Sequence, residues 1–339
     1  MKKTSSSRPA KKRPERPDLY QQVTDKIIAA IERGTLPWRK PWQTDRSRMA
    51  QGSVMPLNGT TGNFYSGVNV LLLWLSACDQ GFSSNRWLTY LQAEAAGGHV
   101  RAGEKATLAV VFKPWERDAK DADGRQLFDD EGNALKERVP MLKPLYLFNI
   151  CQCDGLPDDV VGALPADTPG EDDPQVDERI QAQVSTMVED CGVHLQHVYQ
   201  NRAFYTPSHD LIVLPEVRQF KTEADYWSTL LHELVHSTGH ATRLNREGIT
   251  SSSRKRGDPV YAFEELVAEL GSAFLCARIG VAGDVQHENY LEGWLKIMKE
   301  DKRALFRASS QARQATEFLL MPAVEAEAET VKTDAALAA

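Results

Sequence analysis

The residues with the clearest chemistry in this sequence are His232, Glu233 and His236, which form the pattern His-Glu-x-x-His. On a helix, side chains four residues apart lie on the same face, one turn apart, so both imidazoles can bind one metal ion. Glu233 follows the first histidine, where its carboxylate can act as a general base toward a metal-bound water. The pattern predicts a hydrolytic metal centre with His232 and His236 as ligands and Glu233 as the catalytic residue.

The residues around this pattern favour a helix. Apolar residues recur at helical spacing around the two histidines, namely Leu230, Leu231, Leu234 and Val235. Residues 222–235 contain neither glycine nor proline, and Gly239 follows, as glycine often does just past a helix end. The other interpretation is a surface helix with two incidental histidines. We favour the metal site, because an apolar helix seldom buries histidine and glutamate without a reason.

A catalytic zinc ion needs three protein ligands and an open position for water. His240 lies four residues past His236 and would share its face on a continued helix, although Gly239 argues against continuation there. A longer pattern, His-Glu-x-x-His-x-x-Gly-x-x-His, fails because residue 242 is threonine. The third ligand must therefore also be sought among carboxylates elsewhere in the chain.

Three glutamates interrupt an otherwise apolar segment at residues 261–274: Glu264, Glu265 and Glu269. Glu265 and Glu269 lie four residues apart on one face of the expected helix, where two like charges are costly to bury unless a cation or hydrogen-bond donors compensate them. A metal ion explains them. The simplest assignment makes Glu265 the third ligand and Glu269 the acceptor for the second ring N–H of a ligand histidine.

Other arrangements stay open. The other candidates for the third ligand are Glu264, Glu269 and His240. Without a metal, Glu264 would be exposed, and the other two glutamates could pair with Arg243 or Arg254. Two histidines and one carboxylate suit Zn²⁺, with Mn²⁺ as the alternative cofactor. Candidates for stabilising an oxyanion are His240, Tyr261 and His287.

Length and composition are those of a globular protein with room for two domains, each with its own core. The chain has 339 residues, of which 42% are apolar and 26% charged. No apolar run approaches the length that spans a bilayer, and no apolar segment follows the basic N-terminus as it would in a secretory signal. Five cysteines, an odd number, fit reduced thiols. We therefore expect a cytoplasmic protein that does not bind membranes.

Charge is unevenly distributed along the chain. Residues 1–157 hold 23 Lys and Arg against 17 Asp and Glu, a net charge of +6, whereas the remainder holds 17 against 30, a net charge of −13. A basic first half suggests an anionic partner, and nucleic acid is the usual one. Residues 1–17 are basic and nearly free of apolar side chains, so we expect them to be a disordered leader.

Residues 36–42 place Trp38 and Trp42 beside Arg39 and Lys40. Aromatic faces interleaved with cations suit the stacked bases and the phosphates of single-stranded nucleic acid. A proline-rich loop whose tryptophans pack on the core explains the same residues equally well. A turn rich in glycine and asparagine then leads into a buried helix that begins near Val68. Polar and aromatic groups that could face a ligand there are Asn63, Tyr65 and Asn69.

The remaining elements of the first half indicate an α+β domain. We expect a helix from Asp18 to Gly34, a buried strand at residues 108–112, an exposed charged hairpin or insertion at residues 116–138 and a closing strand at residues 142–150. Residues 154–176 are rich in Asp, Pro and Gly and indicate a linker.

Beyond the linker we expect a helix at residues 180–190 and a short strand at residues 211–214, before the metal helix. An edge strand beside the metal helix could pair with an extended peptide.

With these residues in place, the chain resembles the plasmid-encoded ArdC-type antirestriction proteins, whose first domain is shared by TraC-type conjugative primases. In the first half the resemblance rests on Pro37-Trp38, Pro41-Trp42, Asn58–Asn69, Trp87–Tyr90, Gly103–Lys105 and Leu147–Asn149. In the second half it rests on Tyr205–Pro215, His232–Arg246 and Glu264–Phe274. The resemblance covers roughly residues 18–320, and its motifs occur in the family's order.

The resemblance implies an N-terminal mixed α/β domain that binds single-stranded DNA and a C-terminal zincin-like metallopeptidase domain with glutamate as third ligand. It also implies a role in protecting incoming plasmid DNA from host restriction during conjugation. The expected division is a leader at 1–17, the DNA-binding domain at 18–153, a linker at 154–176, the zincin-like domain at 177–322 and a disordered tail at 323–339.

Three functions follow from these patterns. In the first, the protein binds single-stranded DNA and carries a zinc peptidase that cleaves a host protein. In the second, DNA binding alone supplies the effect, and the metal site is structural or vestigial. The third, a fragment of a primase, is disfavoured because no nucleotidyl-transfer motif or phosphate-binding glycine loop is present.

Overall fold

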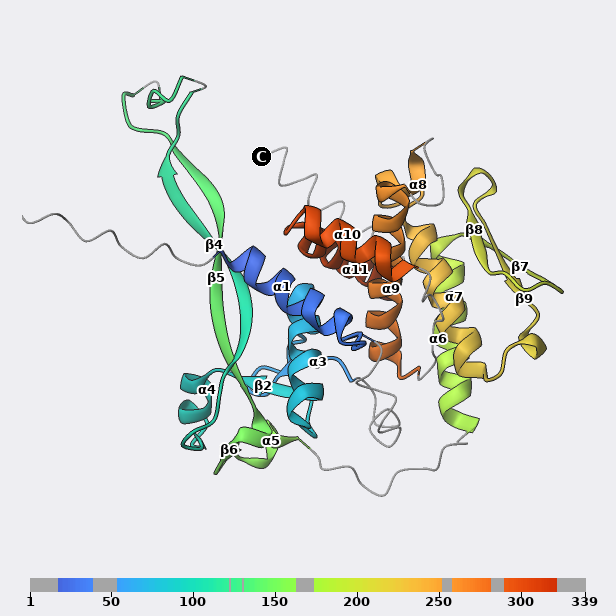
Figure 1. Cartoon of the computed structure of the whole chain (residues 1–339), viewed down its shortest axis with the longest axis horizontal. Coiled ribbons are helices and arrows are strands. Elements are labelled where there is room, and N and C mark those ends of the chain that lie inside the picture. The colour runs from blue at the N-terminus through green and yellow to red at the C-terminus, as the bar shows by residue number, and fades with distance from the viewer. Residues whose placement is uncertain are drawn as a thin grey trace, which may run out of the picture.

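The computed structural model describes residues 18–38, 54–121, 123–129, 131–162, 174–251, 258–281 and 290–321 (Figure 1). Its helices are α1 (Leu19–Glu32), α3 (Val68–Gln80), α4 (Tyr90–Ala95), α5 (Asp158–Val161), α6 (Pro174–Cys191), α7 (Glu223–Thr238), α8 (Glu247–Thr250), α9 (Pro259–Ile279), α10 (Leu291–Glu300) and α11 (Ala304–Leu320). Its strands are β1 (Leu57–Asn58), β2 (Arg86–Leu88), β3 (His99–Val100), β4 (Thr107–Asp118), β5 (Lys136–Asn149), β6 (Cys153–Asp154), β7 (His194–Val198), β8 (Phe204–Thr206) and β9 (Leu211–Pro215). The expected α+β class is confirmed.

The first half of the chain forms a four-stranded sheet in the order β1-β2-β5-β4, with α1 and α3 packed beside it. Helix α1 begins where the sequence predicts, because the Asp18 carboxylate accepts a hydrogen bond from the backbone N–H of Tyr20 at 3.0 Å. The turn before α3 ends at Gly67, whose φ of 59° lies in the left-handed region that favours glycine. Helix α3 then starts at Val68, as expected.

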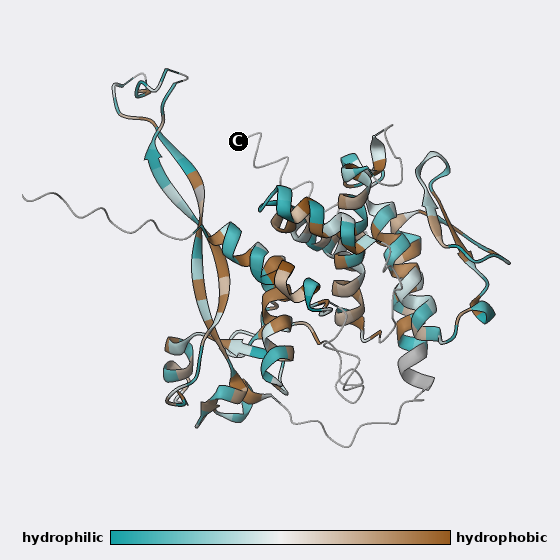
Figure 2. Cartoon of the chain, viewed as in Figure 1, coloured by the Kyte–Doolittle hydropathy of each residue, from teal (hydrophilic) through white to brown (hydrophobic). Residues whose placement is uncertain are grey.

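Strands β4 and β5 form a long antiparallel hairpin. Twelve residue pairs join them, from Thr107 opposite Leu147 to Asp118 opposite Lys136, so the strand expected at residues 108–112 is much longer than its apolar part. In Figure 1 the outer half of this hairpin extends well beyond the helices. The exposed hairpin expected at residues 116–138 is confirmed, and Figure 2 shows that its tip is largely hydrophilic.

The second half of the chain forms the strands and helices that surround α7, the predicted metal helix. Strand β9 lies between β7, its parallel neighbour, and β8, its antiparallel neighbour. Strand β8 is therefore an edge strand, and it contacts α7, the helix that carries the His-Glu-x-x-His pattern. On its other side α7 packs against α9, which is buried along nearly its whole length and also contacts α8, α10 and α11.

The largest core is shared by the two halves, whereas two smaller clusters contain only residues of the first half and of the start of the expected linker. The expectation of a separate core for each half is therefore wrong for the largest cluster. The main hydrophobic cluster contains residues of α1 and α3 together with residues of α7, α9 and α11. Trp74 of α3 packs against Phe274 of α9 with ring centroids 5.9 Å apart. The backbone N–H of Val54 donates to the carbonyl of Ala277 at 2.9 Å. Residues before the expected linker therefore pack directly on α9, the helix that carries the predicted carboxylate ligand.

The expected linker contains structure at both ends. Residues 158–161 form α5, whose Val160 is buried in a small cluster with Leu88 and Ala93 of the first half. Helix α6 already begins at Pro174, and the residues between these helices lie outside the described ranges. Across the part of the chain that the structure describes, every helix is too short or too polar to cross a membrane.

Candidate metal centre

Helices α7 and α9 bring the predicted site together because they approach closely. A Cβ atom placed at Gly271 of α9 would lie 2.8 Å from the Cγ1 atom of Val235 on α7, so the approach depends on the glycine. Gly239, which follows the last residue of α7, is also required by close packing. Its φ is −77°, but a Cβ atom there would lie 2.5 Å from Ile249, so packing rather than a left-handed conformation requires this glycine.

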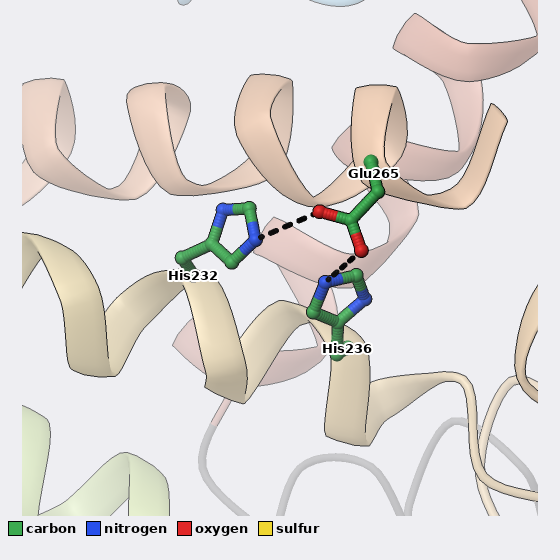
Figure 3. A group of neighbouring side chains, drawn as sticks. All are labelled: His232, His236 and Glu265. Carbon is green, nitrogen blue, oxygen red and sulfur yellow. Dashed lines mark ion pairs between the residues drawn. The ribbon is translucent and has the colours of Figure 1, made fainter. Parts of the chain in front are cut away.

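His232, His236 and Glu265 point toward one another across these two helices (Figure 3). The Nε2 atom of His232 lies 3.7 Å from Glu265 Oε2, and the Nε2 atom of His236 lies 3.5 Å from Glu265 Oε1. One ligand atom from each residue lies within 4.8 Å of the other two, and all three side chains are buried. Two imidazole nitrogens and one carboxylate oxygen in this arrangement suit a single metal cation.

Electrostatics at the site favour a cation. Burial alone would raise the pKa of Glu265, but the nearby His236 and His232 rings and a hydrogen bond from Tyr261 lower it to about 2. Burial alone would lower the pKa of His236, but the carboxylates of Glu265, Glu264 and Glu233 raise it. The carboxylates that favour a protonated imidazole also favour a metal cation in place of the proton.

Glu264 lies beside Nδ1 of His236, the ring nitrogen that does not face Glu265. The Oε1 atom of Glu264 lies 3.2 Å from His236 Nδ1 and accepts a hydrogen bond from Arg246 at 2.6 Å. The guanidinium also donates to the Thr238 hydroxyl at 2.6 Å and the Val235 carbonyl at 2.7 Å. If His236 Nδ1 carries the proton, Nε2 is free to face a metal, as a ligand histidine requires.

Neither the position of Glu264 behind His236 nor its pairing with Arg246 was predicted from the sequence. Glu264 is buried and paired with Arg246, which rules out the interpretation in which Glu264 is exposed. A signal for it was present, because Glu264 stands next to Glu265 in an apolar helix and a second carboxylate needs its own compensating cation.

Glu269 and Trp38 lie behind His232. The indole Nε1–H of Trp38 donates to Glu269 Oε1 at 3.2 Å, and Glu269 Oε2 lies 4.0 Å from His232 Nδ1. Trp38 is only 1% exposed and packs edge-on against Trp294. This corrects the prediction that Trp38 stacks on DNA bases, because its ring faces are covered by the protein core.

The candidates for stabilising an oxyanion have different surroundings. Tyr261 is hydrogen-bonded to Glu265 and to the hydroxyl of Tyr290, at 3.0 Å in the latter case, and burial together with the nearby Glu265 raises its pKa. The Tyr261 hydroxyl therefore lies next to the proposed ligand Glu265, and Tyr261 stays a candidate for stabilising an oxyanion. His240 is partly exposed and bonds through Nδ1 to the Thr242 hydroxyl, outside the ligand group. His287 lies outside the described residues, as does Arg254.

The other predicted DNA contacts have mixed outcomes. Arg39, Lys40 and Trp42 lie outside the described residues. Asn69 has a structural role, because its amide both donates to the Val110 carbonyl and accepts from the Val110 N–H, each at 2.8 Å. Two further predicted contacts are at the surface of the turn before α3: Asn63, which is exposed, and Tyr65, which is half-buried.

Comparison with known families defines the class of both halves. Residues 182–311 match the model of a zincin-like metallopeptidase family, MPTase-PolyVal. Residues 17–148 match the model of the N-terminal domain of the anti-restriction factor ArdC. The site described above lies within the first of these matches, so the chain joins an ArdC-type N-terminal domain to a zincin-like metallopeptidase domain.

Solved structures agree over most of the chain. The metal-free crystal structure of the antirestriction protein ArdC from plasmid R388 is 38% identical, with a TM-score of 0.71, and the match covers 91% of this chain and 98% of that one. The Mn(II)-bound structure of the same protein is 37% identical, with a TM-score of 0.67 and coverage of 90% and 98%. The chain therefore belongs to the ArdC antirestriction family.

Relatives known from sequence include longer proteins. The chain is 33% identical over 304 residues to the uncharacterized protein y4eC of Sinorhizobium fredii, covering 91% of that protein. It is 36% identical to two DNA primases TraC of Escherichia coli, over 309 and 313 residues, and spans only 27% and 20% of their lengths.

Proposed function

We propose that this protein binds single-stranded DNA, carries a metal-dependent peptidase site and protects incoming plasmid DNA from host restriction during conjugation. The observation that carries the peptidase part is the buried convergence of His232, His236 and Glu265 within 4.8 Å, with Glu233 beside the first ligand on α7. Membership of the ArdC family supports the antirestriction role.

In this proposal His232, His236 and Glu265 hold the metal. The bound metal would act as a Lewis acid that polarises a water molecule and the scissile carbonyl. Glu233 would accept the proton of that water and pass it to the leaving amine. Glu264 and Glu269 would fix the rings of His236 and His232, respectively, from behind.

The donor set fits Zn²⁺, as the zincin-like family suggests, and the Mn(II)-bound structure of the R388 protein supports Mn²⁺ as the alternative. An extended peptide could add to the edge strand β8, which contacts α7. The substrate would be a host protein reached in the cytoplasm.

The nucleic-acid part rests on the basic first half of the chain and on the likeness to ArdC and to part of the DNA primases TraC. We retain Arg39, Lys40 and Trp42 as proposed contacts to single-stranded DNA, together with Asn63 and Tyr65. We also retain the proposed division into a DNA-binding domain at 18–153 and a zincin-like domain at 177–322, although the two halves share a core.

A second candidate function is DNA binding with a structural metal site. The observation that favours it is burial, because Glu233 is only 5% exposed and Glu265 only 6%. A structural metal site is closed to solvent, whereas a catalytic one keeps an open position.

A conjugation assay into a restricting host separates these functions. The wild type and Glu233→Ala would be compared for plasmid transfer, and the metal content of both purified proteins would be measured alongside. If the variant keeps its metal and loses protection, chemistry at the metal is required. If it keeps both, the peptidase part of the proposal is wrong and DNA binding carries the function.

A further inference from the structure

The outer half of the β4–β5 hairpin presents a surface that the metal centre does not use. Residues on alternate positions of a strand share a face, and Lys113 and Trp115 of β4 lie opposite Met141 and Val139 of β5 on one such face. Lys143, opposite Val111, belongs to the same face. We call the surface formed by Val111, Lys113, Trp115, Val139, Met141 and Lys143 the outer strip. Its six residues span about 13 Å, given the rise of a β-strand.

Aromatic and apolar groups of the strip are open to solvent. Trp115 is 48% exposed and Met141 is 38% exposed, although both are large hydrophobic side chains. The opposite face also exposes aromatic side chains, Phe112 and Tyr146, so exposure by itself does not single out the strip. What distinguishes Trp115 is that Lys113 and Lys143 lie on the same face.

The charges of the hairpin differ between its two faces. On the opposite face, Arg138 pairs with Glu116 at 2.9 Å and Lys136 pairs with Asp118. On the face of the strip, Arg117 pairs with Glu137. Lys113 and Lys143 form no ion pair with any residue in the described ranges, so the strip has two cations available to an anionic partner.

The face of the strip becomes buried toward the body of the protein. Toward the body of the protein, the same face of the hairpin continues through Ala109, Leu145 and Leu147. These residues pack in one cluster with Tyr65. The strip is therefore the solvent-exposed outer part of a face whose inner part is buried, and its outer end extends away from the helices (Figure 1).

We propose that the outer strip binds single-stranded DNA, with Trp115 stacked on a base and Lys113 and Lys143 in contact with phosphates. This inference rests on the single-stranded-DNA binding proposed above and assigns a surface to it. Single-stranded DNA fits better than duplex, because an aromatic face needs an unpaired base whose own face is open. Two exposed lysines beside one tryptophan supply the phosphate contacts that accompany such stacking.

The test is fluorescence anisotropy of a labelled oligo(dT) titrated with the full-length protein. Trp115→Ala should weaken binding about tenfold, because it removes one base-stacking platform, whereas Trp115→Phe should lose less than about threefold. The matched control is Phe112→Ala, since Phe112 is 51% exposed on the opposite face of the same hairpin. It should change affinity by less than about twofold.

A second pair of variants separates specific contacts from overall charge. Lys113→Ala with Lys143→Ala should lower the slope of log affinity against log salt by about 1.4, since each phosphate contact on single-stranded DNA contributes about 0.7. The control, Lys136→Ala with Arg138→Ala, removes the same charge from the opposite face and should leave the slope nearly unchanged.

Each outcome has a distinct meaning. If the wild type does not bind oligo(dT), both the proposed DNA binding and the strip are wrong. If the wild type binds and the strip variants match it, the strip is wrong while the proposed function stands. Equal losses in the strip variants and in their controls also refute the strip, because general charge or hairpin folding then explains them. Equal competition by a DNA duplex refutes stacking on an unpaired base.

Discussion

Replacing Trp38 with phenylalanine should weaken metal binding while leaving the protein folded. The indole N–H of Trp38 donates to Glu269 at 3.2 Å, and the other oxygen of Glu269 lies 4.0 Å from His232 Nδ1. Phenylalanine keeps an aromatic ring in the core and removes only the donor and part of the ring. The Glu269 carboxylate would then lose a partner that fixes its orientation behind His232.

The size of the effect follows from the kind of hydrogen bond lost. A hydrogen bond to a charged group contributes about 1.5–3 kcal/mol, and loss of a partner behind a metal ligand commonly costs about 10–100-fold in metal affinity. Because Trp38 acts through Glu269 and not directly on the ligand, we expect the lower end, about a tenfold increase in the Kd for Zn²⁺. Stability should fall by about 1–3 kcal/mol from the smaller side chain and the lost bond.

The assay is competition between the metal-free protein and a chromophoric chelator for Zn²⁺, with urea unfolding of the metal-free protein measured in parallel. Trp294→Phe is the matched control. Trp294 is fully buried and packs against Trp38, but its indole Nε1 has no hydrogen-bond partner among the described residues. It should lose stability with less than about a twofold change in Kd. If both variants change stability and neither changes Kd, Trp38 is a packing residue only and the reasoning fails.

Three further predictions concern the framework of the site. Gly271→Ala should destabilise the protein by about 1–3 kcal/mol in urea unfolding, because its Cβ would meet Val235 at 2.8 Å and push α7 from α9; wild-type stability would contradict the close approach. Glu264→Gln should cost about 3–5 kcal/mol, since it leaves Arg246 buried without its charged partner; a loss below about 1 kcal/mol would show that the pair is not buried as described. In the metal-free protein the pKa of His236 is raised. The protonated ring therefore contributes to stability below about pH 6.5, and this contribution is lost as the pH rises through the higher pKa of the folded state. The affinity for Zn²⁺ should increase over the same pH range, because the metal replaces the proton. Thermal unfolding and metal titration across pH check this, and parallel rather than opposite trends would refute it.

The sequence was sufficient to predict the metal helix and the side chains that meet there. His232, His236 and Glu265 converge as the spacing within each helix predicts, because helical periodicity fixes which residues share a face. Periodicity also placed Glu269 on the face of Glu265 as an acceptor for a ligand histidine, and its Oε2 atom lies 4.0 Å from His232 Nδ1. It did not assign such a role to Glu264, which depends on how α9 is rotated against α7.

Trp38 shows where local patterns fail. Tryptophan beside arginine and lysine is typical both of a base-stacking loop and of a loop anchored in the core, and only a contact 231 residues away decides between them. The prediction of a linker at residues 154–176 was wrong at both ends for a related reason. Asp, Pro and Gly also occur around short helices, and α5 is held by Val160 packing on distant residues of the first half.

The same kind of contact explains the shared large core. Trp74 and Phe274 are apolar residues in their own helices, and nothing in either segment indicates that they pack together across the expected domain boundary. Composition correctly predicted enough apolar residues for a core, but it could not predict that the two halves would share one.

The central claim is that His232, His236 and Glu265 hold one metal ion on which Glu233 acts. The most direct test is the Zn²⁺ stoichiometry and Kd of the wild type, Glu265→Ala and Glu233→Gln. We predict one ion per wild-type chain, affinity at least about tenfold weaker without Glu265, and an affinity for Glu233→Gln within about threefold of wild type. Full-strength binding by Glu265→Ala would contradict the ligand assignment, and loss of the metal from Glu233→Gln would make Glu233 a ligand rather than a base.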